Sequence, residues 1–206
     1  KALDEAFGAL RKSSAAVPEM RQLAAPAITS LKAVAEKKMA GVKVLVGKVE
    51  GADIYTVYRA VGGSVTEIGR TNAQGVVYDQ NPVSKKTASY YAVAESSAGQ
   101  YKKSAEGAVK TIRLEASVKK ITAKRIGKKT QVRLSWKKVK KAQKYVVYRS
   151  TKKSSGYVRL KTLKKNAKSY VDKKVKKGKT YYYRIVIKTK SGYSGITTSK
   201  KIKIKK

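Results

Sequence analysis

The chain contains two copies of one pattern, 90 residues apart. When the sequence is shifted by 90, residues 27–59 lie over residues 117–149 without a gap, and apolar positions fall on apolar positions. The clearest match is Tyr55-Thr-Val-Tyr-Arg59, which overlies Tyr145-Val-Val-Tyr-Arg149. Repetition at a fixed spacing indicates that one structural unit is used twice. The sequence therefore predicts two domains of the same kind, over residues 24–114 and 115–206.

The match continues beyond residue 149 with small changes in length. Val77-Tyr78-Asp79 aligns with Tyr170-Val171-Asp172, and Tyr90-Tyr91 aligns with Tyr182-Tyr183. We expect the second copy to repeat the whole fold of the first, and not only its central part.

The residues ahead of both copies have a pattern of their own. Residues 8–23 match residues 99–114 in length and in apolar positions. We therefore expect residues 1–23 to be the C-terminal remnant of a preceding repeat, in a longer protein that has upstream domains. The competing hypothesis is a short amphipathic helix over about residues 2–12.

Apolar and polar residues alternate in the second copy, as they do in half-buried β-strands. Val132, Leu134 and Trp136 share one face of such a strand, and similar runs recur between turns rich in Gly, Ser and Lys. The chain also has 14 tyrosines, and aromatic residues favour strands. The pattern predicts an all-β protein of two antiparallel β-sandwiches. Only Leu114-Glu-Ala-Ser117 joins them, without Gly or Pro, so we expect a fairly stiff rod.

Three motifs in the second copy carry a resemblance to a known family. They are Val-x-Leu-x-Trp over 132–136, Tyr-x-Val-Tyr-Arg over 145–149, and Tyr-Val-Asp-x-x-Val-x-x-Gly-x-Thr-Tyr-x-Tyr-x-Ile over 170–185. Both copies resemble fibronectin type III domains of secreted proteins from Gram-positive bacteria. The resemblance implies two tandem immunoglobulin-like β-sandwiches. It also implies that Trp136 is the core tryptophan and that Tyr181 is the "tyrosine corner", whose hydroxyl bonds nearby backbone.

The first copy departs from this family pattern at three positions. Val46 replaces the core tryptophan, Ser89 aligns with the corner tyrosine, and Lys86 aligns with Gly178. We expect the first copy to be folded and less regular than the second.

The composition excludes most catalytic and metal chemistry. The chain has no Cys and no His, so thiolate sites, imidazole sites and Ser-His-Asp triads are impossible. Residues 117–206 contain a single acid, Asp172, so paired carboxylates are absent there as well. We predict no enzyme, no catalytic residue, no metal and no cofactor. No apolar run approaches the length of a membrane-spanning helix.

Asp79 and Asp172 recur at matching places in the two copies, each just before a turn. Catalysis by either would need a second carboxylate. Capping of the following turn, or an ion pair with the recurring Arg59 or Arg149, explains the recurrence better. We predict structural roles for both.

The basic residues are concentrated in the second half of the chain. Residues 1–116 hold 17 Lys+Arg and 11 Asp+Glu, whereas residues 117–206 hold 33 and one. Such asymmetry is typical of a chain whose basic end binds a polyanion. Lys outnumbers Arg by 40 to 10, which favours diffuse, salt-sensitive attraction over geometric reading of an anion.

The family topology places three turns of the second copy at the pole where the chain exits. We predict that the lysines of these turns and of the exit strand form one polyanion-binding surface, the lysine tip: Lys128, Lys129, Lys152, Lys153, Lys173, Lys174, Lys176, Lys177, Lys179, Lys203, Lys205 and Lys206. The expected partner is an anionic cell-envelope polymer, such as teichoic acid or an acidic glycan. Nucleic acid is less favoured, because the sequence has no recognised nucleic-acid motif.

Tyr148 and Tyr182 are expected to point outward on neighbouring strands, as Tyr58 and Tyr90 do in the first copy. Such a pair can stack on sugar rings, dock another domain, or stabilise the sheet as a cross-strand pair. The last interpretation is favoured, because the pair is present in both copies whatever their charge.

Two roles fit these features. The first is a non-catalytic extracellular spacer at the cell surface or cell wall, whose last domain attaches to the anionic polymer. The alternative is a set of accessory C-terminal modules of a larger secreted hydrolase, a glycosidase or peptidase with its catalytic domain upstream. Both rest partly on the family resemblance.

Overall fold

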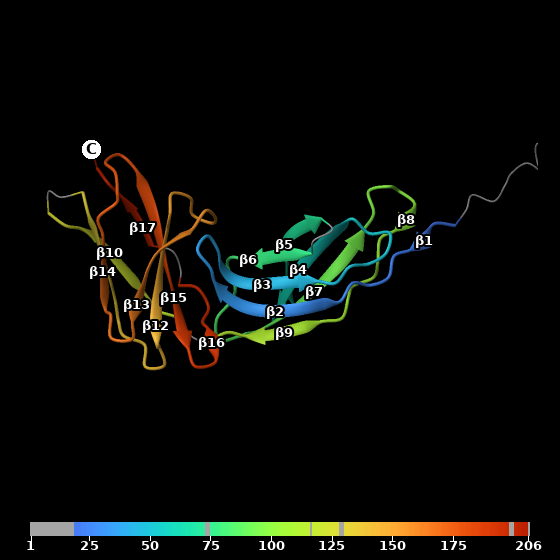
Figure 1. Ribbon diagram of the computed structural model, residues 1–206, viewed down its shortest axis with the longest axis horizontal. Coiled ribbons are helices and arrows are strands. Elements are labelled where there is room, and N and C mark those ends of the chain that lie inside the picture. Colours follow the sequence, from blue (N-terminus) through green and yellow to red (C-terminus); the bar gives the residue numbers. More distant parts are fainter. Residues whose placement is uncertain (1–18, 73–74, 116, 128–129, 198–199, 206) are drawn as a thin grey trace, which may run out of the picture.

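The described part of the chain consists of β-strands in two tandem sandwiches. The structure is a computed structural model, and it describes residues 19–72, 75–115, 117–127, 130–197 and 200–205 (Figure 1). No helix in this part is long and apolar enough to cross a membrane. The prediction of an all-β chain with two tandem β-sandwiches is confirmed.

The first module packs a three-stranded sheet against a four-stranded sheet. The smaller sheet has the order β2 (Ile28–Ala35), β3 (Ala40–Val46) and β6 (Val76–Asp79). The larger sheet has the order β5 (Ser64–Asn72), β4 (Ile54–Val61), β7 (Thr87–Glu95) and β9 (Lys110–Arg113).

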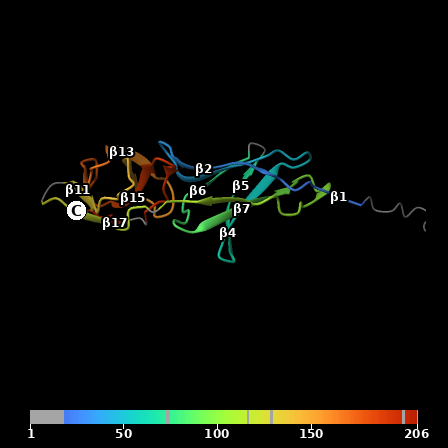
Figure 2. The same cartoon turned by 90° about the horizontal axis from the view of Figure 1, so that it is seen from below.

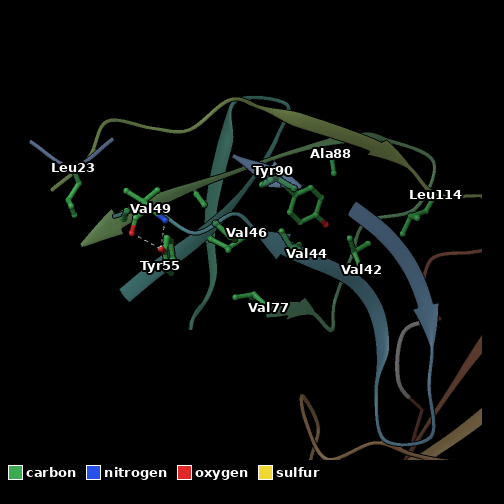
Figure 3. Packing of buried hydrophobic residues seen from close by; sticks show 14 residues of the cluster. Leu23, Val42, Val44, Val46, Val49, Tyr55, Val77, Ala88, Tyr90 and Leu114 are labelled. Carbon is green, nitrogen blue, oxygen red and sulfur yellow. Dashed lines mark hydrogen bonds between the residues drawn. The ribbon is translucent and has the colours of Figure 1, made fainter. Parts of the chain in front are cut away.

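A short parallel pair, β1 (Arg21–Gln22) with β8 (Tyr101–Lys102), ties the entering chain to the first module. Leu23 then enters the core next to Val49 and Tyr55 (Figure 3). Both hypotheses for residues 1–23 fall mostly on residues 1–18, which lie outside the described residues.

The second module repeats this plan. Its smaller sheet has the order β10 (Ile121–Arg125), β11 (Val132–Trp136) and β14 (Ser169–Asp172). Its larger sheet is built around β15 (Thr180–Thr189), which pairs with β12 (Lys144–Ser150), β16 (Gly192–Tyr193) and β17 (Lys200–Lys203). The edge strand β13 (Val158–Lys164) pairs with β12.

Each core consists of the inward side chains of both sheets. In the second module the alternate residues Val132, Leu134 and Trp136 point into the core, as the sequence predicts. The ring of Trp136 packs against that of Tyr145, with 5.5 Å between the ring centroids. In the first module Val42, Val44 and Val46 occupy the matching places (Figure 3). Because Val46 is smaller than Trp136, the first core is filled with more small side chains.

A tyrosine hydroxyl fixes the turn before the third strand in both modules. The backbone N–H of Val49 donates to the Tyr55 hydroxyl, and the N–H of Val139 donates to that of Tyr145, both at 2.8 Å. These pairs are 90 residues apart, like the rest of the repeat. The Tyr181 hydroxyl accepts from the N–H of Lys176 at 3.0 Å, which is a corner contact of the predicted kind.

The structure corrects the alignment of the two central strands by one residue. Arg59 faces Tyr90 across its sheet, and Arg149 faces Tyr183 across the other. Tyr90 therefore corresponds to Tyr183 and points inward, contrary to the prediction that it points outward. The first copy has two adjacent tyrosines here and the second has three, so the sequence does not reveal the slip, yet the slip moves every side chain to the opposite face.

The same shift changes which residues of the first module correspond to Tyr181 and Gly178. Ala88, and not Ser89, stands in place of Tyr181. Lys85, and not Lys86, stands in place of Gly178. The backbone verifies the second pair, because Lys85 has φ 65° and Gly178 has φ 75°. Both N–H groups also donate to the residue that ends their module, Leu114 or Ile204.

The two modules do not continue one another as a straight rod. The hairpin between β2 and β3 packs against the outward face of β12 and β15, so that the strands of the second module run across those of the first (Figure 1 and Figure 2). Ala35 and Ala40 of the hairpin contact a cluster that contains Val146, Tyr148 and Val186. The hairpin of the first module therefore meets the side of the second module, an arrangement that the short linker permits.

Candidate functional site

Arg, Asp and Tyr form the same buried cluster in both modules. Asp172 is 2% exposed, and it accepts hydrogen bonds from the Arg149 guanidinium at 2.9 Å and from the Tyr183 hydroxyl at 2.8 Å. The N–H of Lys174 also donates to this carboxylate, at 3.0 Å. Because Arg149 and Tyr183 belong to the larger sheet and Asp172 ends a strand of the smaller one, the cluster joins the two sheets.

The first module contains the equivalent cluster. Asp79 accepts from Arg59, from the Tyr90 hydroxyl and from the N–H of Asn81. Burial, and then the adjacent carboxylate, raise the pKa of the Tyr90 hydroxyl, and the same two causes raise that of Tyr183. Both aspartates therefore cap a turn and hold an arginine, as the sequence analysis predicted, and their lone pairs are occupied within the fold.

This arrangement leaves the second module without an acid to balance its lysines. Asp172, its single acid, is buried in the cluster. Among the described residues the lysine tip has no ion pair with a carboxylate. The other ion pair of this module joins Lys141, at the opposite pole, to Glu115 of the linker. The positive charge on its surface is therefore largely uncompensated.

The described lysines of the tip are all exposed and fall into two groups. One group lies in the β14–β15 turn and on the exit strand, which are joined by hydrogen bonds between Gly178 and Ile204 and between Ile204 and Lys179. The members of this group are Lys173, Lys174, Lys176, Lys177, Lys179, Lys203 and Lys205. Lys128, Lys129 and Lys206 lie outside the described residues.

The second group, Lys152 and Lys153, lies in the β12–β13 turn beside the first module. The carbonyl of Lys153 accepts from the Arg184 guanidinium at 3.2 Å. Lys153 also lines a hollow with Asn81 and Pro82 of the first module. The second group of the lysine tip therefore lies at the junction between the modules.

Four further lysines, which the prediction did not include, surround a groove at the opposite pole. Lys119, Lys120, Lys137 and Lys138 line a groove of about 560 Å³ beside Trp136. In the sequence these residues look like ordinary solvated turns. The signal that could have identified them is the pairing of the two strands that they flank.

The outward tyrosines of the second module form the interface with the first. Tyr148 is fully buried, and its hydroxyl donates to the carbonyl of Glu36 at 2.8 Å. Burial raises the pKa of this hydroxyl. The favoured interpretation, a simple cross-strand pair, is therefore wrong for Tyr148, which docks another domain. Tyr58 in the first module instead stacks on Tyr91 at 5.2 Å between ring centroids.

Arg184 is the polar centre of this interface. It donates to the carbonyl of Gln80 at 2.8 Å and to the Asn81 side chain at 2.7 Å, and its guanidinium lies 4.1 Å from the centre of the Tyr157 ring. Burial lowers the pKa of this guanidinium. Sequence reasoning missed this role, because an outward arginine on a strand is normally solvated.

The described residues hold no group of three or more His, Cys, Asp or Glu that could bind a metal ion. The buried charged side chains, Asp79, Asp172 and Arg184, belong to the Arg–Asp–Tyr clusters and to the interface. The remaining surface of the second module presents exposed ammonium groups.

Comparisons with known proteins find similarity only among solved structures. No family model and no curated protein matches the chain. It is similar to an Fn3-like protein from Clostridium thermocellum, with 23% identity over 44% of this chain and 94% of that chain, and a TM-score of 0.41.

Two tandem structures from chicken are also similar to it. The FN1-FN3 domains of CNTN1 share 14% identity over 90% of this chain and 66% of that chain, with a TM-score of 0.38. A two-domain fibronectin type III segment of tenascin shares 16% identity over 86% of this chain and 98% of that chain, with a TM-score of 0.38. The assignment of two tandem β-sandwiches rests on the strand order described above.

Proposed function

We propose that the chain is a pair of non-catalytic extracellular modules whose second member attaches to an anionic polymer of the bacterial cell envelope. The polymer is a cell-wall teichoic acid or an acidic polysaccharide, and the first module acts as a spacer held at a fixed angle. The secreted, Gram-positive setting is part of this proposal and rests on the motif resemblance alone.

One observation carries the proposal. The single acid among residues 117–206, Asp172, is buried against Arg149, while the lysines around it are exposed. Like charges crowded at one end of a small module repel one another, and that repulsion lowers its stability. A bound polyanion would relieve the repulsion, and the release of its counterions would add to the affinity.

The test measures retention of the full chain on immobilised heparin and on purified cell wall over a range of salt concentrations. Replacing Lys173, Lys176 and Lys177 by Gln should weaken binding and flatten its dependence on salt. If each lysine neutralises one anionic group, the slope of log affinity against log salt should fall by about 2 to 3.

The matched control replaces three exposed lysines of the first module, Lys32, Lys48 and Lys86, by Gln. It removes the same charge from the protein, so a net-charge effect would act on both variants alike. Equal losses in the two variants, or retention that does not depend on salt, would contradict the proposal.

The alternative role, as accessory modules of a larger secreted hydrolase, would use the same surface to hold that enzyme on its substrate. The sequence of the full gene product distinguishes the two. A catalytic domain ahead of these modules would favour the accessory role, and further sandwich modules would favour the spacer role.

A further inference from the structure

The groove beside Trp136 is formed by the way two strands begin and end. β10 and β11 are antiparallel, and Ile121 at the start of one faces Trp136 at the end of the other. The residues just outside this last pair are Lys120 and Lys137, so the pairs Lys119–Lys120 and Lys137–Lys138 leave the sheet side by side. The groove lies between them.

The ammonium groups of these four lysines are crowded together and repel one another. Like charges on adjacent strands destabilise a sheet. All four are exposed, and in the described structure none of them has a carboxylate partner. The Lys138 ammonium donates to the side-chain carbonyl of Asn166 at 3.0 Å, which orders this side chain without neutralising it.

The groove also offers hydroxyl groups and an apolar wall. Thr122 and Ser135 are partners across β10 and β11, and both line the groove. Within the described residues, neither the Thr122 nor the Ser135 hydroxyl makes a hydrogen bond. Trp136 and Val139 complete the wall, and the indole N–H of Trp136 has no partner in the described structure.

We propose that this groove binds a short segment of an acidic glycan. The lysines would hold its carboxylate or sulfate groups, Thr122 and Ser135 would bond to its ring hydroxyls, and the apolar wall would lie against a ring face. The inference rests on the proposed function and narrows it, because it favours an acidic polysaccharide over a polymer recognised by charge alone. Cavities of several hundred Å³ with a few placed polar groups are typical ligand sites.

The test uses the single tryptophan of the chain as a reporter in the groove. The fluorescence of the full chain is followed while a heparin hexasaccharide is added at low ionic strength, and inorganic polyphosphate of similar charge is the comparison. We expect a saturable change in emission with the hexasaccharide, and no saturable change with polyphosphate.

Variants then assign the signal to the groove. Replacing Lys119, Lys120 and Lys137 by Gln should weaken the hexasaccharide about tenfold, because each contact to an anionic group is a charge-assisted hydrogen bond. The control replaces exposed lysines elsewhere in the module, Lys161, Lys190 and Lys201, and should change the affinity less than about twofold at equal net charge.

A second pair of variants tests the hydroxyls without changing charge. Thr122→Val keeps the shape of the side chain and should weaken the hexasaccharide, whereas Thr162→Val, on the exposed edge strand, should not. Equal effects of the two threonine variants, or of the two triple-lysine variants, would refute the proposal that the groove binds the glycan.

The outcomes separate this inference from the proposed function. Unchanged tryptophan emission together with salt-sensitive retention on heparin would refute the groove and leave the lysine tip in place. Loss of both would refute the two proposals together. The same saturable emission change with polyphosphate would refute recognition of a glycan.

Discussion

The interface between the modules predicts a measurable energetic coupling between Arg184 and Asn81. Arg184 is 7% exposed, and its bond to the Asn81 side chain is one of two that it makes to the first module. A hydrogen bond to a charged group contributes about 1.5–3 kcal/mol, and burial of the guanidinium offsets part of this. We expect Arg184→Met to destabilise the chain by about 2 kcal/mol, a net value below the sum of two such bonds.

Asn81→Ala is a clean second change. The Asn81 backbone bonds to Asp79 and Arg59, and its side chain bonds to Arg184, so the substitution removes only the contact between modules. If that contact exists in solution, the two changes are not independent. The double variant should then be less destabilised than the sum of the single ones, by about 0.5–2 kcal/mol.

The assay is scanning calorimetry, with small-angle scattering as a second readout. Each kcal/mol lost should lower the midpoint temperature of the first unfolding transition by about 4–8 °C in a module of this size. Scattering should report loss of the bent arrangement in the double variant. Arg133→Met, an exposed arginine on β11, is the control and should change neither. Additive effects of Arg184→Met and Asn81→Ala, with unchanged scattering, would refute the reasoning.

Three further changes test the interior of the modules. Lys85→Gly should stabilise the first module and Gly178→Ala should destabilise the second, each by about 0.5–1 kcal/mol in thermal melts, because both positions have a left-handed backbone that only Gly adopts without strain. A change of stability in the same direction for both variants would contradict this explanation. Asp172→Asn should cost about 2–3 kcal/mol in urea unfolding, since it leaves the partly buried Arg149 without its carboxylate; an unchanged midpoint would show that the ion pair is not needed. Burial raises the pKa of Tyr183 above its ordinary value of 10.0, so its contribution to the free energy of unfolding is fully present below pH 10 and falls above it, where the tyrosine of the unfolded chain ionises. Tyr183→Phe should make the alkaline loss of stability shallower by up to about 1.4 kcal/mol per pH unit, and an unaltered alkaline slope would contradict the assignment.

Local patterns in the sequence were sufficient for the fold. The alternation of Val132, Leu134 and Trp136 and the repeat at 90 residues predict two sandwiches, because the period of a strand is a local property of the chain. The recurrence of Asp79 and Asp172, together with that of Arg59 and Arg149, likewise predicted a turn cap or an ion pair. The number of acids in the second half is also a sequence property, and it already required a strongly basic module.

Tertiary structure decided what a local pattern leaves open. The runs of adjacent tyrosines, two in the first copy and three in the second, hid a one-residue slip. Only the pairing with Arg59 and Arg149 decided which tyrosine points inward. Whether Tyr148 faces solvent or another module depends on the angle at which the modules meet, which no strand encodes by itself. The groove at Trp136 depends in the same way on the register that sets Lys120 beside Lys137. Strand period and composition act within a few neighbouring residues, whereas contacts between distant segments are set by the packing of the whole chain.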